Sequence, residues 1–338
     1  MGQNIMAVYD SDEAYVTKLM DYFCEVRPVP VEIRGFTEWD ALKGFAEENP
    51  VDILLVEEAN LKDEMEELKF GEIMVLSEEA GTRKDGRGHK NVCKYQSTEN
   101  IMREVMSYYA EEPEELSAAL SGSICHLIGV YSPVRRSLQT SFSLTLGELL
   151  SRREKTLYVN MEDYSGFHSL LKESFMSDLS DLVFYVGQNK KNFPYKLASI
   201  VQRVGQLDYI PPAIYPTDLK TVDISTWLLL FEKLITSGYG TIIVDFGDGI
   251  KDLTELLKIC ELIYMPVRTD RVSEAKLEQY EASMRIMEQS ELLNKTKKLE
   301  FPYFRDLDCS PENLEQTSLG DYVRKLLSEG SPWDVGGV

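Results

Sequence analysis

The stretch Ile124–Leu150, ICHLIGVYSPVRRSLQTSFSLTLGELL, decides how the larger part of this chain folds. An apolar run, Ile124–Tyr131, predicts a buried strand, and helical spacing of apolar residues begins at Thr140. The polar loop Ser132–Gln139 lies between them. A strand, a loop and a helix in this order are typical of a phosphate-binding loop, in which backbone N–H groups and a helix N-terminus hold an anion. This loop, however, contains neither glycine nor lysine.

Composition predicts a globular, cytoplasmic protein. At 338 residues we expect two or three domains, and a net charge of −21 argues against nucleic acid or anionic lipid as a partner. The five cysteines form no CxxC pair and the three histidines are far apart, so we expect no metal site. No apolar run approaches the roughly 20 residues of a membrane-spanning helix, and membrane contact is expected to be peripheral at most.

Residues 1–110 alternate between short apolar runs and amphipathic segments. The runs predict five strands, at Ile5–Tyr9, Val31–Ile33, Asp52–Val56, Glu72–Leu76 and Val92–Tyr95. The amphipathic segments predict helices at Asp12–Cys24, from a Thr37 cap to Glu48, and at Thr98–Ala110. This alternation indicates a small doubly wound parallel sheet with helices on both faces. The polar stretch Ser77–Lys90 predicts a shortened or mobile helix.

Residues 111–123 are acidic and then small and polar, which predicts a linker. The same alternation resumes over residues 124–330 and predicts a second, larger doubly wound sheet, followed by a flexible tail at 331–338. Its further strands are expected at Thr156–Asn160, Thr241–Asp245, Leu262–Val267 and Lys298–Phe301. Its further helices are expected at Gly166–Leu171, Ser177–Val186, Val222–Ser237, Lys251–Leu257, Val272–Gln289 and Leu319–Leu327.

The first domain resembles the receiver domain of bacterial response regulators over its whole length. Such domains carry acidic residues after the first strand, a phospho-accepting Asp after the third, a hydroxyl residue after the fourth and a Lys at the end of the fifth. The residues of this chain at those positions are Asp10, Asp12, Glu57, Ser77 and Lys94. Glu57 replaces the accepting Asp, and its extra methylene displaces the carboxylate by about 1.5 Å. In-line attack tolerates little misplacement.

Three interpretations of these receiver residues remain open. They are remnants that hold loops in place, or Glu57 mimics a phosphorylated Asp by reaching toward Ser77 or Lys94, or phosphorylation still works. The resemblance implies two-component signalling only under the last of these.

The order of motifs in residues 124–330 resembles the deviant-Walker ATPases of the MinD/ParA family. It is most similar to the CpaE-like branch that joins a receiver-like domain to such an ATPase in Tad/Flp pilus assembly. The family loop reads Ser-Pro-Lys-Gly-Gly-Val-Gly-Lys-Thr-Thr. Here Ser132 and Pro133 match the family loop, and Thr140 and Ser141 stand at the positions of its hydroxyl pair. At the remaining positions the residue type differs: Val134 replaces the signature lysine, Arg135 and Arg136 replace the paired glycines, Leu138 replaces the third glycine, and Gln139 replaces the P-loop lysine.

Bulky residues at glycine positions are expected to change the path of the loop and to leave no room for a triphosphate. The positions of the family's acidic pair after the next strand are occupied by Asn160 and Glu162. Asp245 occupies the Walker B position, and Gly247 and Gly249 follow it at the position of the family's flexible switch segment. Of the hydrolytic parts, only Thr140 and Asp245 persist. The degenerate nucleotide site thus comprises Ser132, Arg135, Arg136, Gln139, Thr140, Ser141, Asn160 and Asp245.

We therefore predict a pseudo-receiver followed by a pseudo-ATPase, without catalytic residues or a required cofactor. The resemblance implies a scaffold or regulator whose partners are other proteins of a pilus-assembly or localisation machinery, and a homodimer, because relatives dimerise around ATP. One alternative is a switch that binds ATP and Mg²⁺ through Arg135 and Arg136 with little or no hydrolysis. The other is a signalling protein of the response-regulator type.

Overall fold

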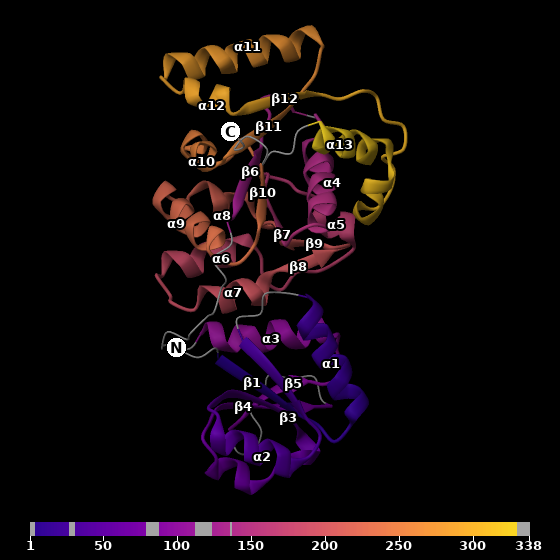
Figure 1. The fold of residues 1–338 in the computed structure, drawn as a ribbon. Helices are drawn as coiled ribbons and strands as arrows, with labels where there is room; N and C mark the ends of the chain where they lie inside the picture. The colour runs from indigo at the N-terminus through magenta and orange to yellow at the C-terminus, as the bar shows by residue number, and fades with distance from the viewer. Residues whose placement is uncertain (1–3, 27–30, 79–87, 112–123, 136, 330–338) are drawn as a thin grey trace, which may run out of the picture. The chain divides into compact units, whose positions relative to one another are not determined.

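The computed structural model describes residues 4–26, 31–78, 88–111, 124–135 and 137–329 (Figure 1). The chain divides into two compact units: residues 1–121 together with Lys190–Ser199, and residues 122–189 together with 200–338. Both are α/β, as predicted. Most of the predicted linker, the predicted tail at 331–338 and most of the polar stretch after Ser77 lie outside the described residues.

The first unit is built on a five-stranded parallel sheet with the order β2-β1-β3-β4-β5. This is the order of the flavodoxin-like doubly wound fold. Its strands are β1 (Asn4–Tyr9), β2 (Val31–Phe36), β3 (Val51–Glu57), β4 (Phe70–Ser77) and β5 (Lys90–Cys93). The strand β3 is apolar because both faces of a covered parallel sheet are buried, and Ile53 to Val56 have no exposed surface.

The helices of this sheet are α1 (Glu13–Val26), α2 (Trp39–Glu48) and α3 (Thr98–Ala110). The α3 bounds agree with the prediction, and its N-cap Ser97 accepts a hydrogen bond from the backbone N–H of Asn100. The predicted Thr37 cap is wrong: the N-cap of α2 is Glu38, whose side chain makes no capping bond. Two short 3₁₀ helices, η1 (Glu58–Asn60) and η2 (Asp63–Glu67), connect β3 to β4.

A segment of the second half of the sequence, Lys190–Ser199, belongs to the first unit. It contains most of α7 (Phe193–Ile200), where Tyr195 stacks on Tyr109 with ring centroids 5.5 Å apart. The side-chain amide of Asn192 donates to the backbone carbonyl of Tyr109 at 3.2 Å. No sequence pattern predicted this helix.

The second unit is built on a seven-stranded sheet with the order β12-β11-β6-β10-β7-β9-β8. All neighbours pair in parallel except β8, which runs antiparallel to β9 at the edge. The strands are β6 (His126–Val130), β7 (Thr156–Met161), β8 (Gln202–Val204), β9 (Leu207–Ile210), β10 (Thr241–Phe246), β11 (Leu262–Val267) and β12 (Thr296–Glu300). The β8–β9 pair was not predicted.

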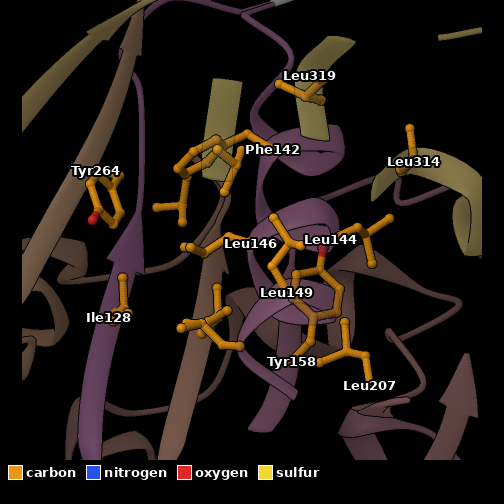
Figure 2. Packing of buried hydrophobic residues seen from close by; sticks show 14 of the residues in the cluster. Ile128, Phe142, Leu144, Leu146, Leu149, Tyr158, Leu207, Tyr264, Leu314 and Leu319 are labelled. Atoms are coloured by element: carbon orange, nitrogen blue, oxygen red, sulfur yellow. The ribbon is translucent and has the colours of Figure 1, made fainter. Parts of the chain in front are cut away.

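The helix α4 (Gln139–Ser151) lies at the centre of the main core of this unit (Figure 2). Phe142 is fully buried and meets Tyr264 edge-on, with ring centroids 5.3 Å apart. The helix α13 (Ser318–Ser328) packs against α4 through a stripe that includes Leu319 and Val323. Because α4 is buried along most of its length, its N-terminus is held firmly at one edge of the sheet.

The other helices of this unit lie around the same sheet (Figure 1). They are α5 (Phe167–Leu171), α6 (Leu179–Gly187), α8 (Pro216–Lys220), α9 (Ile224–Ile235), α10 (Leu253–Ile259), α11 (Arg271–Ile286), α12 (Ser290–Asn294) and the 3₁₀ helix η3 (Pro311–Gln316). Within the described residues, no helix has the length and apolar character needed to span a membrane.

Candidate functional site

Polar side chains gather at the C-terminal edge of each sheet, where ligands bind in doubly wound folds. In the first unit they follow β1, β3 and β5. In the second unit they follow β6, β7 and β10, at the point where the chain connections change direction across the sheet.

In the first unit, Lys94 joins two carboxylates. Its Nζ lies 2.7 Å from Oδ2 of Asp10 and 2.5 Å from Oε1 of Glu57. Asp10 is fully buried, and its other oxygen accepts the backbone N–H of Asp12 at 2.9 Å. Asn60 donates to the second oxygen of Glu57 at 3.0 Å. The structure thus brings Asp10, Glu57 and Lys94 together.

The charge of Lys94 is firmly held in this cluster. Burial works against the charged ammonium group, but the hydrogen bonds to Asp10 and Glu57 outweigh it and raise the pKa of Lys94. The ammonium also lies 4.7 Å from the ring centroid of Tyr15, a cation–π distance. Burial raises the pKa of Tyr15 to about 12, against the opposing effect of Lys94.

The remaining receiver residues lie at the edges of this cluster. Ser77 is buried at the end of β4, and its backbone carbonyl accepts the N–H of Lys94 at 2.8 Å. Asp12 is exposed, and its carboxylate accepts the N–H groups of Ala14 and Tyr15 in the first turn of α1. Asp12 therefore caps the first turn of α1. The contact between Glu57 and Lys94 is compatible with both the remnant and the mimic interpretation, and the choice between them stays a prediction.

In the second unit, one residue of the loop after β6 keeps the backbone conformation that a glycine has in a phosphate-binding loop. Leu138 has φ 60° and ψ 26°, the left-handed conformation for which glycine is favoured. Leu138 is the N-cap of α4 and makes no side-chain capping bond. Earlier in the loop, the Ser132 hydroxyl donates to the carbonyl of Pro266 at 2.6 Å and accepts the N–H of Val134.

Asp245 is enclosed by neutral hydrogen-bond donors. The side-chain amide of Gln139, which takes the place of the P-loop lysine, donates to its Oδ1 at 2.6 Å, and the Tyr158 hydroxyl donates to Oδ2 at 2.9 Å. Asn160 in turn donates to that hydroxyl at 2.8 Å. Burial and the nearby Glu162 carboxylate raise the pKa of Asp245 to about 7, although the hydrogen bonds oppose the shift.

Thr140, the second hydrolytic residue that persists, is also bonded to a protein group. Its hydroxyl donates to Oε2 of Glu162 at 2.7 Å, and the backbone N–H of Glu162 donates to Asn160 at 2.9 Å. Burial raises the pKa of Glu162, while Thr140 and Arg135 lower it. The Glu162 carboxylate therefore lies at the N-terminus of α4, on the hydroxyl expected to meet a Mg²⁺ ion in a working site.

A cavity of about 430 Å³ lies beside this network, within the size range of small-molecule sites. At the former glycine positions, the side chains of Arg135 and Leu138 line this cavity, while Arg136 lies outside the described residues. The expectation that bulky residues leave no room for a triphosphate therefore stays a prediction. The lining residues are Ser132, Val134, Arg135, Ser137, Leu138, Gln139, Thr140, Ser141, Glu162, Asp163, Tyr164, Phe246, Gly247 and Asp248.

Of the glycines after β10, Gly247 is required by close approach to backbone atoms, whereas Gly249 faces side chains that can move. A Cβ on Gly247 would lie 2.6 Å from the carbonyl of Met161, and one on Gly249 would lie 2.1 Å from Oδ1 of Asp163. Arg135 lies 3.4 Å from Asp248, with 75% of its side chain exposed. Arg136, the second predicted anion-binding arginine, lies outside the described residues.

Of the predicted site residues, Ser132, Arg135, Gln139, Thr140 and Ser141 line the cavity, while Asn160 and Asp245 lie in the network behind it. Sequence reasoning missed Tyr158, Asp163 and Asp248. A tyrosine within an otherwise apolar strand was a signal for Tyr158, since a buried hydroxyl needs a partner. The two aspartates follow predicted strands, where acidic side chains meet at one edge.

Comparison with solved structures finds similar α/β proteins at low identity. A plasmid partition protein from Borrelia burgdorferi bound to AMPPNP is 16% identical, with a TM-score of 0.40 over 59% of this chain and 98% of its own. The MinC:MinD complex of Aquifex aeolicus is 16% identical, with a TM-score of 0.39 over 52% of this chain and 68% of its own. The ATP complex of a Cyanothece McdA variant is 14% identical, with a TM-score of 0.40 over 62% of this chain and 81% of its own. No curated protein matches the chain.

The match to a protein family covers the first unit. Residues 3–110 match the model described as "TadZ-like, receiver domain", which is about a third of the chain. The strand order and the lysine–carboxylate cluster described above are those expected for a receiver fold. Residues 3–110 therefore form a receiver domain of the TadZ-like family.

Proposed function

We propose that this protein is a non-catalytic localisation or scaffold component of a Tad-like pilus-assembly system. Its receiver domain is of the type found in TadZ-like proteins, and its second unit has the layout of a MinD/ParA-type ATPase. Under this proposal the chain works through binding surfaces, as a partner for other assembly proteins or for a second copy of itself.

The single observation that carries the proposal is the state of the two hydrolytic residues that persist. Thr140 is bonded to Glu162, and Asp245 is bonded to Gln139 and Tyr158. Phosphoryl transfer depends almost entirely on positioning and on neutralising negative charge. Here the lysine that would supply positive charge is an amide, and the hydroxyl in the first turn of α4 is bonded to the Glu162 carboxylate.

The proposal is tested by thermal unfolding with and without ATP and Mg²⁺. A ligand present at a hundred times its dissociation constant stabilises a protein by about 2.7 kcal/mol, which shifts the midpoint by several degrees. We expect no shift of the second unit at millimolar ATP and Mg²⁺. The paired variant Arg135→Ala with Arg136→Ala serves as the control, and it should behave like the wild type.

A reproducible upward shift that disappears in this double variant would contradict the proposal. It would instead support the other candidate function, a switch that binds ATP with little hydrolysis. Two observations favour that candidate: the cavity of about 430 Å³ and the absence of a side-chain cap at the N-terminus of α4, which leaves backbone N–H groups toward an anion.

A further inference from the structure

The helix α7 is too short to be ordered by its own backbone. It has eight residues, and isolated helices shorter than about 12 residues are marginal in water. Its proline, Pro194, lies in the first turn, where the missing N–H group has no helical partner to lose. The order of α7 must therefore come from the groups that pack against it.

Side chains on two opposite faces of α7 are buried. Phe193 and Leu197 are four residues apart, so they lie on the same face, and both are almost fully buried. Tyr195 is two residues from each of them, so it points from the opposite face, and it has no exposed surface. The helix thus has packing partners on both faces, and it cannot loosen without losing contacts on both.

The receiver domain holds the Tyr195 face of α7. The rings of Tyr195 and Tyr109 stack with centroids 5.5 Å apart, and the side-chain amide of Asn4 donates to the Tyr195 hydroxyl. Directly before the helix, the side-chain amide of the buried Asn192 donates to the backbone carbonyl of Tyr109 at 3.2 Å. The start of β1 and the end of α3 therefore both bind α7.

The group that binds α7 is itself fixed in the receiver sheet. The Tyr109 hydroxyl donates to the backbone carbonyl of Asp52 in β3 at 2.8 Å, and the Asp52 carboxylate accepts the N–H of Ile5 in β1 at 2.7 Å. At its other end, α3 begins at Thr98, four residues after Lys94. One helix thus extends from the lysine–carboxylate cluster to the contact with α7.

The strand pair β8–β9 of the second unit follows α7 directly along the chain. The helix ends at Ile200 and β8 begins at Gln202. The strand β8 has three residues and pairs on one side only, so its order is more easily lost than that of the inner strands. Its partner β9 places Tyr209 opposite Tyr158, which bonds Asp245.

We propose that α7 transmits the state of the receiver domain to the strand pair β8–β9. While β1 and α3 hold Tyr195, α7 is helical and fixes the start of β8. When this contact loosens, α7 and β8 lose order together. Such coupling operates through a local unfolding equilibrium that the contacts at both ends of the element bias. The inference goes beyond the proposed function and does not depend on whether the second unit binds ATP.

The experiment is hydrogen–deuterium exchange of the full chain, measured by mass spectrometry on peptides from α7, β8–β9, α3 and β12. The substitution Tyr109→Leu removes the ring that stacks on Tyr195. We expect the amides of α7 and β8 to exchange about tenfold faster or more, whereas those of β12, at the other edge of the same sheet, stay unchanged. Tyr195→Phe removes only the hydroxyl bonded to Asn4 and should speed the same amides by roughly two- to tenfold.

The matched control is Tyr108→Leu, the neighbouring residue on α3. The Tyr108 hydroxyl lies 3.5 Å from the carbonyl of Asn91 and 3.4 Å from Glu104, both within the receiver domain. This variant should leave the exchange of α7 unchanged. Because coupling is reciprocal, Tyr195→Phe should also speed exchange at the end of α3.

A variant at the far end of α3 tests transmission over distance. Lys94→Met breaks the lysine–carboxylate cluster and should speed exchange in α7 and β8, whereas Lys43→Met, on α2, should not.

Three results would overturn the inference. Unchanged exchange of α7 in Tyr109→Leu would mean that the receiver domain does not hold the helix. Faster exchange in α7 with unchanged exchange in β8–β9 would make α7 a part of the receiver domain alone. Faster exchange throughout the second unit, β12 included, would indicate global unfolding. If Tyr109→Leu does not fold, Tyr195→Phe decides the outcome by the same criteria.

Discussion

The two sheet edges of this protein hold their buried carboxylates in opposite ways. In the receiver domain, the ammonium group of Lys94 lies 2.7 Å from the fully buried Asp10. In the second unit, Asp245 is equally buried, but the groups that reach it are the amide of Gln139 and the hydroxyl of Tyr158. Both edges belong to doubly wound sheets, but the group bonded to the buried aspartate is charged in the receiver domain and neutral in the second unit.

This difference determines the protonation state of each edge. A cation at hydrogen-bond distance keeps a buried carboxylate ionised, whereas neutral donors only partly replace the water that burial removes. Accordingly the pKa of Lys94 is raised by its carboxylate partners, and the pKa of Asp245 is raised to about 7 by burial. At one edge a lysine is held in its charged form between two carboxylates, and at the other the pKa of a buried aspartate is raised.

The largest expected effect follows the removal of Lys94. The substitution Lys94→Met leaves Asp10 buried without a cation and should lower the free energy of unfolding of the receiver domain by about 3–5 kcal/mol. Urea unfolding followed by the fluorescence of Trp39, a core residue of this unit, measures the change.

The matched control is Lys43→Met in the same domain. Lys43 pairs with Glu64 at 3.4 Å, and both side chains are largely exposed, so its loss should cost less than about 1 kcal/mol. Equal costs for the two variants would show that the Lys94 cluster does not hold the receiver edge together.

The second unit should lose stability as the pH rises toward neutral. The pKa of Asp245 is about 7 in the folded state and about 3.8 when unfolded, so the folded protein binds the extra proton between these values. The free energy of unfolding then falls with rising pH, by at most about 1.4 kcal/mol per pH unit, and levels off above pH 7.

The variant Asp245→Asn removes this titration. Urea unfolding between pH 5 and pH 8, followed by the fluorescence of the buried Trp227, should give a flatter pH profile for the variant than for the wild type. Identical slopes in the two proteins would mean that Asp245 is ionised throughout, and that the contrast between the two edges is absent.

A smaller effect is expected for Glu57→Gln, because Asp10 still neutralises Lys94. The loss of one charged hydrogen bond should cost about 1–2 kcal/mol in the same Trp39-monitored unfolding. Mass spectrometry after incubation with acetyl phosphate and Mg²⁺ should find no phosphate on either protein. Labelling of the wild type that is lost in Glu57→Gln would favour the signalling alternative.

The smallest effect is expected for Arg135→Ala. Its guanidinium is mostly exposed and lies 3.4 Å from Asp248, so the stability of the second unit should change by no more than about 0.5 kcal/mol. A loss of several kcal/mol would place Arg135 within the structure of the loop rather than on its surface.

Sequence patterns predicted the parallel sheets because covered parallel strands are continuous apolar runs. Thr98–Ala110 and Leu262–Val267 were predicted with the observed bounds. The helix α7 and the β8–β9 pair were missed, since the former has its partners in the first unit and the latter is short and lies at a sheet edge. Contacts between residues far apart in sequence leave no local pattern to read.

The sequence predicted most of the residues that line the candidate site, but it did not predict the hydrogen bonds between them. Sequence order placed Thr140 and Asp245 near each other, because both adjoin central strands of one sheet. It offered no means to see that Glu162 bonds Thr140 or that Gln139 bonds Asp245. It placed Leu138 at a glycine position and predicted a changed loop path there, whereas Leu138 keeps the left-handed conformation favoured for glycine. These features depend on side-chain geometry, which local sequence patterns do not record.

The most direct test of the central claim is steady-state phosphate release by the purified full chain with ATP and Mg²⁺. Because Thr140 and Asp245 are bonded within the protein, we predict a rate no higher than that of the double variant Thr140→Ala with Asp245→Asn. Phosphate release by the wild type that is abolished in this variant would contradict the account.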